Sequence, residues 1–170
     1  DESQIEQGRN FNNKVWNAFR LVTGWTVDAA AQQPEASAVA VKWFDNKLSQ
    51  VVETVEDHFS KFRISDALMA IYKFFWDDFC AWYLEAVKPA YGAGIDKNTY
   101  DATIGFFDAL LKMIHPIMPF ITEELWQNMA ERKAGETIMN QRYPQAKPYD
   151  AEFIAAFEMA CEAVAGVRNS

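Results

Sequence analysis

Hydrophobic residues recur at helical spacing over most of this sequence, and the strict alternation that is typical of strands is scarce. In residues 3–22, a helix with about 100° per residue gathers a set of apolar side chains on one arc. These are Phe11, Val15, Ala18, Phe19 and Val22. The opposite arc holds Arg9, Asn13, Trp16, Asn17 and Arg20. The pattern therefore predicts an amphipathic helix with an apolar back and a front of cations, amides and one indole.

The same periodicity predicts five further helices. We expect them at residues 35–62, 64–87 and 97–114, then one that ends near residue 132, and a last one at residues 151–167. The predicted fold is an all-α antiparallel helix bundle with a small irregular or strand segment near residues 134–148. We expect one domain over residues 1–170, made of a core bundle (3–132), a small segment (133–149) and a terminal helix (150–170).

The helix expected at residues 64–87 is apolar on more than one side, which predicts a central place in the bundle. At α-helical spacing, one narrow arc holds Leu68, Phe75, Phe79, Trp82 and Ala86. We therefore interpret the aromatic residues of this helix as core and not as a cofactor site: Phe74, Phe75, Trp76, Phe79, Trp82 and Tyr83. Trp43, in the preceding helix, is also expected to pack.

The composition excludes several classes of protein. Half of the residues are hydrophobic and 15% are aromatic, which argues against disorder. Cys80 and Cys161 lie far apart in the sequence, and we interpret them as reduced, buried thiols of a cytoplasmic protein. No leader and no membrane span is expected. The chain starts without Met and stops straight after a helical pattern, so we expect both ends to lie within a longer protein.

Net charge narrows the possible partners. At −8, the chain is a poor candidate for indiscriminate binding of nucleic acid, since affinity for phosphates comes largely from Lys and Arg. The front of the first helix is different, because it carries two arginines and no acid. Planar cations, amides and an aromatic ring are the groups that read single-stranded RNA. An ordinary solvated face is the alternative interpretation of the same residues.

Motifs for catalysis, phosphate loops or metals are not found in the sequence. Gly92-Ala93-Gly94 lacks the third glycine and the lysine that a phosphate loop requires. His58 has no ligand partner at useful spacing. Glu123 and Glu124 are explained by a helix start, where acids oppose the positive end of the dipole. We therefore predict no catalytic residue, no metal site and no cofactor among these residues.

Four blocks of sequence resemble the valyl-tRNA synthetase family, which belongs to the class I aminoacyl-tRNA synthetases. They occur in the family's order and are residues 8–18 (GRNFNNKVWNA), 75–85 (FWDDFCAWYLE) with Lys88-Pro89, 115–126 (HPIMPFITEELW), and 137–139 (TIM) with Tyr143-Pro144. The third block is shared with isoleucyl, leucyl and methionyl relatives, whereas the first two favour the valyl family. The ATP signatures H-I-G-H and K-M-S-K-S of class I synthetases are absent.

The resemblance implies an anticodon-binding helical domain that grips the anticodon stem and loop of tRNA(Val). The contacts would come from Arg9, Asn13, Trp16, Asn17, Arg20 and Lys47. Position 47 departs from the family, where arginine is more common, so Lys47 keeps the charge but loses bidentate geometry. The parent enzyme would be a cytoplasmic monomer that activates valine with ATP and Mg²⁺ in a catalytic domain outside these residues. A separate editing domain and a C-terminal coiled coil would complete it.

Three alternatives remain open at this stage. The same domain could belong to an isoleucyl- or leucyl-tRNA synthetase. The bundle could be a helical protein-interaction module without RNA binding, which a stable dimer without RNA would favour. It could also be an enzyme in its own right, for which adenylate formation by these residues alone would be needed.

Overall fold

The computed structural model describes residues 2–169, except for the side chains of residues 4, 168 and 169. The elements follow in the order α1 (Glu2–Thr23), β1 (Val27–Asp28), α2 (Glu35–Ser60), α3 (Ile64–Lys73), the π-helix η1 (Phe74–Tyr83), α4 (Leu84–Val87), β2 (Ile95–Asp96), α5 (Lys97–Ile114), α6 (Pro119–Met129), the 3₁₀ turn η2 (Ile138–Asn140) and α7 (Ala151–Asn169). The predicted all-α bundle is confirmed, and α5 has the predicted bounds.

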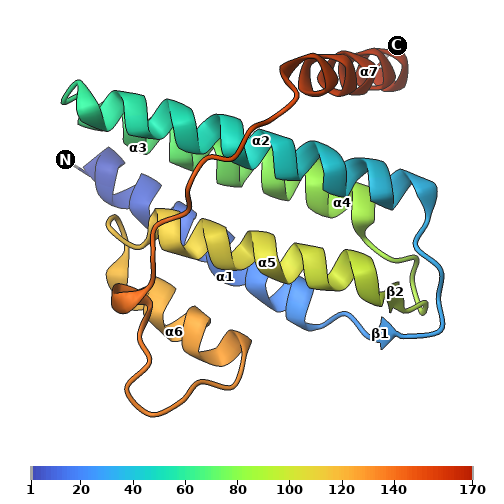
Figure 1. Cartoon of the computed structure of the whole chain (residues 1–170), viewed down its shortest axis with the longest axis horizontal. Coiled ribbons are helices and arrows are strands. Elements are labelled where there is room, and N and C mark those ends of the chain that lie inside the picture. Colours follow the sequence, from blue (N-terminus) through green and yellow to red (C-terminus); the bar gives the residue numbers. More distant parts are fainter. Residues whose placement is uncertain (1, 170) are drawn as a thin grey trace.

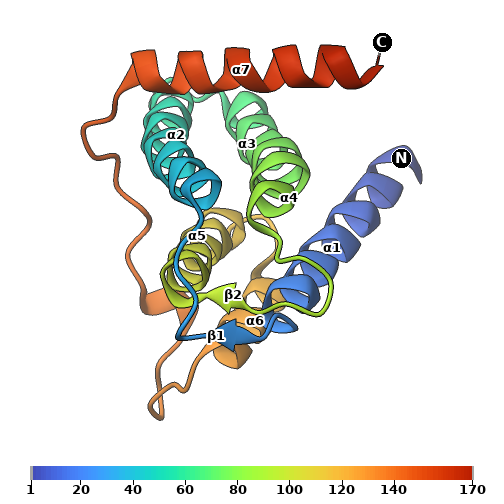
Figure 2. The same ribbon diagram turned by 90° about the vertical axis from the view of Figure 1, so that its right-hand side faces the viewer.

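The helices are arranged in layers, or levels, and Figure 2 shows them from one end of the bundle. α2 runs beside the rod formed by α3, η1 and α4, and α1 and α5 lie on one side of this pair, with α6 beyond them. α7 crosses the opposite side as a separate level and packs on α2. The core therefore lies between the α2–α4 pair and the α1–α5 level.

The helix predicted at residues 64–87 is continuous, but its middle is a π-helix. Its innermost residues recur every four positions and are all buried: Ala67, Ile71, Phe75, Phe79, Tyr83 and Val87. In a plain α-helix a four-residue repeat drifts by about 40° per step, because four residues exceed one turn. The wider π turns reduce this drift and keep the stripe facing the core.

This geometry corrects one expectation about the core. Trp82 was expected to pack with Phe75 and Phe79, yet it is 40% exposed. The prediction assumed α-helical spacing, whereas the π turns bring Tyr83 to the inner side and turn Trp82 outward. The hydroxyl of Tyr83 lies 2.8 Å from that of Thr103, so its polar end has a partner inside the core. Burial raises the pKa of Tyr83.

Phe44 of α2 is the centre of the aromatic core. It is fully buried, stacks on Phe74 at 4.9 Å between ring centroids, and also contacts Phe79, Tyr83 and Phe106. Rings from α2, η1 and α5 therefore meet at one point. Such ring pairs add stability beyond the burial of their area.

Two short strands connect the segment after α1 with the segment after α4. β1 and β2 pair in parallel, with Val27 opposite Ile95. A Cβ on Gly94 would lie 2.8 Å from the Cβ of Asp28, so only glycine permits this approach of the two segments. The small segment at residues 133–149 is irregular, as predicted, and contains η2. β1 and β2, the strands among the described residues, lie outside this segment.

Glu123 has a different role from the one expected. α6 begins at Pro119, so Glu123 lies beyond the first turn. Its carboxylate accepts hydrogen bonds from the hydroxyl of Thr137 and, at 2.8 Å, from the backbone N–H of Ile138. These two bonds attach η2 to α6, and hydrogen bonding to the charged form lowers the pKa of Glu123 against the opposing effect of desolvation.

Residues 141–150 connect η2 to α7 and run along the bundle in an extended conformation (Figure 1). We call this segment the strap. The N–H of Lys147 donates to the hydroxyl of Ser49 at 3.2 Å, and that of Asp150 donates to the side chain of Asn46 at 2.9 Å. Both acceptors belong to α2. The strap is therefore attached to the helix that α7 crosses.

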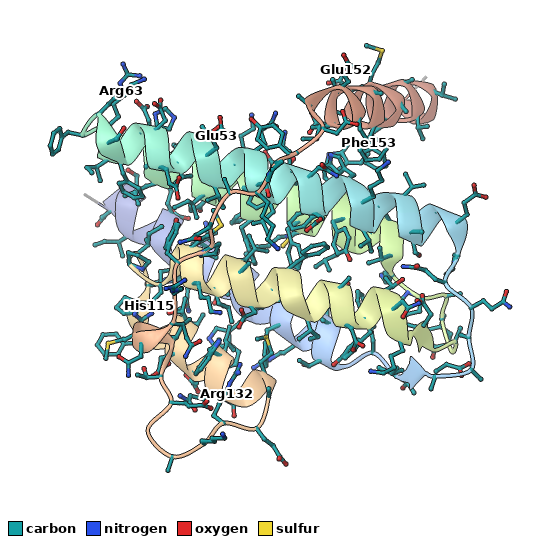
Figure 3. All side chains as sticks on the ribbon, in the orientation of Figure 1. Glu53, Arg63, His115, Arg132, Glu152 and Phe153 are labelled. Atoms are coloured by element: carbon teal, nitrogen blue, oxygen red, sulfur yellow. The ribbon has the colours of Figure 1, made fainter. Side chains whose placement is uncertain are left out.

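Trp43 of α2, which is 2% exposed, packs against α7. Its ring stacks on Phe157 at 4.9 Å, and its indole N–H donates to Glu158 at 3.4 Å. The prediction that Trp43 packs is confirmed. Figure 3 shows Phe153 where α7 faces α2, and the ammonium of Lys42 lies 4.2 Å from the centre of that ring.

Both cysteines are free thiols, as predicted. Cys80 is buried, and burial raises its pKa to about 12, so it stays protonated. Cys161, on α7, is only half-buried, which corrects the expectation that both are buried. Within residues 2–169, no helix combines the length and the apolar character needed to cross a membrane.

Candidate nucleic-acid interface

The front of α1 is turned to solvent. Arg9, Asn13, Asn17 and Arg20 are exposed, and Trp16 is half-buried. The opposite face is the core face, on which Phe11, Val15, Ala18 and Val22 are at most 5% exposed. The predicted orientation of the helix is therefore confirmed, and the five front residues share one accessible surface. We call these five residues the α1 face.

Trp16 and Arg20 form a pair one helical turn apart. The Cζ atom of Arg20 lies 5.6 Å from the centre of the Trp16 ring, and Trp16 meets Phe19 edge-on at 6.4 Å. A guanidinium over an indole gains cation–π attraction and is held in place. The pair therefore offers a positive group and an aromatic edge at one position, while only part of the indole remains accessible for stacking.

The charge around the α1 face has the opposite sign to that of the whole chain. Residues 7–27 contain Arg9, Lys14 and Arg20 and no Asp or Glu, although the net charge is −8. None of these three cations forms an ion pair with the residues that the structure describes, where the pairs involve Lys47, Lys61, Lys97 and Lys112. Three cations free of carboxylate partners are therefore available to bind phosphate.

Lys14 was not among the predicted site residues. It is half-buried at the edge of the α1 face, and its ammonium lies 5.4 Å from the centre of the Trp76 ring of η1. Trp76 in turn stacks on Tyr72 at 5.7 Å. The absence of acids over residues 7–27 was a sequence signal that could have identified Lys14. The prediction missed it because it considered only one arc of the first helix. Lys14 thus extends the cationic surface toward η1.

Lys47 does not join the α1 face. Its ammonium lies 2.6 Å from the carboxylate of Glu158 on α7, and its side chain is only 18% exposed. α7 packs on the side of α2 that is opposite to α1 (Figure 2). The structure therefore separates Lys47 from the other five predicted residues and gives it a partner within the chain.

The groove beside Lys47 has a volume of about 430 Å³ and lies between α2, η1 and α7. Its walls include the carboxyl groups of Asp78, Glu158 and Glu162. Desolvation raises the pKa of Asp78 to about 6, against the opposing effect of Lys47. Three acids against Lys47 and Lys73 make this groove unsuited to phosphate. No group of three or more His, Cys, Asp or Glu among the described residues could hold a metal ion.

Comparison with known proteins gives the family to which the chain belongs. Residues 41–170 match the family described as the anticodon-binding domain of tRNA ligase. The chain is similar to valine–tRNA ligases from Parabacteroides distasonis (59% identity) and Porphyromonas gingivalis (58%), in each case over 99% of this chain and 19% of the relative. A valine–tRNA ligase from Dechloromonas aromatica is 36% identical over 99% of the chain.

The chain thus spans about a fifth of the length of the curated relatives that it matches. The family match begins within α2, so the α1 face lies outside it, whereas the alignments with the relatives cover nearly the whole chain. The family match therefore supports the bundle from α2 onward, and it does not cover the α1 face.

Proposed function

Because the chain belongs to the family of anticodon-binding domains of tRNA ligases, we propose that it binds the anticodon stem and loop of a valine tRNA. The observation that supports this most directly is the α1 face, which is exposed, free of acids and positive on a chain of net charge −8. Its charge gives an acidic protein one place where RNA is attracted.

The residues of the α1 face, and Lys14 at its edge, have complementary roles in this proposal. Arg9, Lys14 and Arg20 meet phosphates, and the amides of Asn13 and Asn17 hydrogen-bond to base edges. Arg9 and Arg20 are 11 residues apart, which is roughly 16 Å along a helix. That length suits contact with several consecutive nucleotides of a single-stranded loop, and the edge of Trp16 borders the same path.

The complete protein, in this proposal, is a cytoplasmic, monomeric valine–tRNA ligase. Activation of valine with ATP and Mg²⁺ takes place in its catalytic domain, and these residues contribute binding and positioning only. Support comes from the valine–tRNA ligases that are similar over 99% of the chain. The role of Lys47 is to hold α7 through Glu158, and the RNA contacts are assigned to α1 alone.

The test is a double substitution, Arg9→Ala with Arg20→Ala. Both side chains are exposed and without ion pairs to described residues, so the fold should be kept while affinity for RNA falls. We expect binding of an anticodon stem-loop of valine tRNA, followed by fluorescence anisotropy at low salt, to weaken by about tenfold or more. In the complete ligase, the KM for tRNA should rise while formation of valyl-adenylate without tRNA stays the same.

The matched control is Lys61→Ala with Lys97→Ala. Lys61 caps the C-terminal end of α2 and pairs with Asp57, and Lys97 begins α5 and pairs with Asp101. Their removal changes the net charge by the same amount and should alter affinity by less than about twofold. Equal losses in both double variants, or no loss in either, would reject the α1 face. A stem-loop of isoleucine tRNA tests the valine assignment and should bind more weakly.

A further inference from the structure

The turn between α2 and α3 is a second surface feature, and we call its residues 59–64 the α2–α3 tip. The N–H of Phe62 donates to the carbonyl of Phe59 at 3.1 Å, and that of Arg63 donates to the carbonyl of His58 at 2.8 Å. Together these bonds form a Schellman motif, a common way for a helix to end. The motif places Phe62 in the left-handed region of the backbone, where its φ is +58°.

Phenylalanine is an unfavourable residue at this position of the motif, where glycine is usual. In the left-handed region the Cβ of an L-residue comes too close to its own backbone, and glycine avoids this because it has no Cβ. Within residues 2–169, Phe62 is the single non-glycine residue with a positive φ. The turn itself therefore does not account for a phenylalanine here.

Packing within the bundle does not account for the ring either. Phe62 is 89% exposed, and it forms no ring pair with another aromatic residue that the structure describes. Ile64 beside it is 49% exposed, and Phe59 is 37% exposed. Figure 3 shows Arg63 pointing away from the bundle, and its guanidinium forms no ion pair with the described residues. The tip is therefore an apolar projection with one cation available to a partner.

The charge near the tip disfavours RNA as that partner. Residues 53–66 contain four acids, namely Glu53, Glu56, Asp57 and Asp66, and two cations. One of the cations, Lys61, is already bound to Asp57 at 3.0 Å. Affinity for phosphates comes largely from unpaired Lys and Arg, which leaves Arg63 alone at this end of α2. Exposed apolar side chains around one cation fit a protein surface instead.

The size of the tip indicates which protein surface. Phe59, Phe62 and Ile64 together expose on the order of 300 Å². A stable complex of separate molecules buries about 800 Å² on each partner, so the tip is too small to hold a second copy of the chain. A small contact is sufficient within one polypeptide, because the covalent connection keeps the local concentration of the partner high.

We propose that the α2–α3 tip is the docking surface for the rest of the ligase, with Phe62 seated in an apolar pocket and Arg63 paired with an acid at the rim of that pocket. The inference rests on the proposed function, in which the complete protein is a valine–tRNA ligase of the length of its relatives; this chain covers 19% of them. α1 begins at the same end of the bundle as the tip (Figure 1), so a segment that leads into α1 arrives at this end. The ring of Phe62 is then buried in the assembled enzyme.

The first experiment replaces Phe62 by the photo-reactive p-benzoylphenylalanine, which keeps a ring, in the complete ligase without tRNA. Irradiation should join position 62 to a peptide of the same molecule outside these 170 residues, and mass spectrometry identifies that peptide. The matched control is the same replacement at Tyr91, a fully exposed ring in the loop between α4 and β2, at the other end of the bundle, which should give no such product. A product with a second copy, no product, or equal yields from both positions would overturn the inference.

The second experiment, Phe62→Gly, separates backbone strain from docking. In the 170-residue chain the loss of strain should raise the unfolding temperature by about 2–4 °C, without faster hydrogen exchange at the tip. In the complete ligase the same substitution should make exchange of the tip amides about fivefold faster or more, because the docked ring is lost. Exchange in the ligase that does not change would contradict docking.

Both experiments are independent of RNA, so the two proposals can fail separately. A ligase that binds the stem-loop but gives no cross-link from position 62 overturns the docking surface and leaves the α1 face standing. A ligase that gives the cross-link but does not bind the stem-loop supports the docking surface and refutes the α1 face.

Discussion

Burial and nearby charge act against each other at Asp78. Its carboxyl group lies in the groove between α2, η1 and α7, where desolvation raises the pKa to about 6, with further upward effects from Glu158 and Asp77. Lys47 and Lys73 act downward. An unfolded aspartate titrates near pH 4, so the folded protein binds this proton more tightly than the unfolded chain. The ionised form therefore destabilises the fold. This cost is absent below about pH 4, grows between about pH 4 and 6, and is complete above about pH 6.

Asp78→Asn removes that cost. We expect the free energy of unfolding in urea to rise by about 1–2 kcal/mol at pH 7.5 and to change little at pH 4. Asp77→Asn is the control, since Asp77 is the exposed neighbour in sequence and should have a small effect at both pH values. A stabilisation by Asp78→Asn that does not depend on pH would show that ionisation of this group is not its source.

At the scale of elements, α7 is attached to the bundle by few contacts. Trp43 stacks on Phe157, Glu158 binds Lys47, and the strap meets α2 at Ser49 and Asn46. The outer side of α7 remains exposed, with Met159 at 70%. α7 should therefore open before the rest of the fold, as sparsely packed elements do.

Phe157→Ala tests this attachment. Phe157 is half-buried, so we expect a cost of about 1–2 kcal/mol, below the 3–5 kcal/mol of a fully buried ring. The loss should appear as trypsin cleavage after Arg142, in the strap, that is about tenfold faster under native conditions. Met159→Ala, on the exposed side of the same helix, should leave the cleavage rate unchanged. Equal rates in both variants and the wild type would contradict local opening of α7.

Helical periodicity was sufficient to predict the main elements, because α1, α2 and α5 each have one apolar stripe that matches an α-helix. It failed at η1 because the stripe there repeats every four residues, and α-helical spacing then assigned Trp82 to the wrong side. The β1–β2 pair was missed because each strand has two residues, too few for any alternation to show. Contacts between distant residues, such as those of Gly94 with Asp28 or Lys47 with Glu158, leave no local pattern in a single sequence.

The candidate site was partly accessible from the sequence. The exposure of Arg9, Asn13, Asn17 and Arg20 follows from the position of the apolar arc, and the structure confirms it. Lys47 was carried over from a family pattern, and only the packing of α7 shows that its ammonium has a partner. The hollow of about 650 Å³ between Gly24–Thr26 and the loop Lys88–Gly94 could not be predicted, since these two segments are more than 60 residues apart and meet through β1 and β2.

For the whole molecule, net charge and local charge predict different behaviour. A net charge of −8 repels nucleic acid at long range, and salt screens this repulsion as well as the attraction of the α1 face. Arg9 and Arg20 of that face, together with Lys14 at its edge, limit the number of phosphates that can be neutralised there. The salt dependence of RNA binding should therefore be shallow compared with that of a basic protein.

We expect the logarithm of the binding constant for the stem-loop to fall with the logarithm of salt concentration with a slope of about −2 to −3. Lys14→Ala should make this slope shallower by about 0.7–1, because one phosphate contact is lost. Lys97→Ala, on α5, should leave it unchanged. A slope much steeper than −3 would mean that cations beyond Arg9, Lys14 and Arg20 take part in binding.

The strap that carries α7 back to α2 also bears on how the chain assembles. The contacts of Lys147 with Ser49, Asp150 with Asn46 and Glu158 with Lys47 join residues 98, 104 and 111 positions apart, whereas α2 and α3 are neighbours along the chain. Contacts with such long separations form late in folding. During synthesis from the N-terminus, the indole of Trp43 therefore stays uncovered until α7 has been made. That interval is when a partly made chain is most open to aggregation.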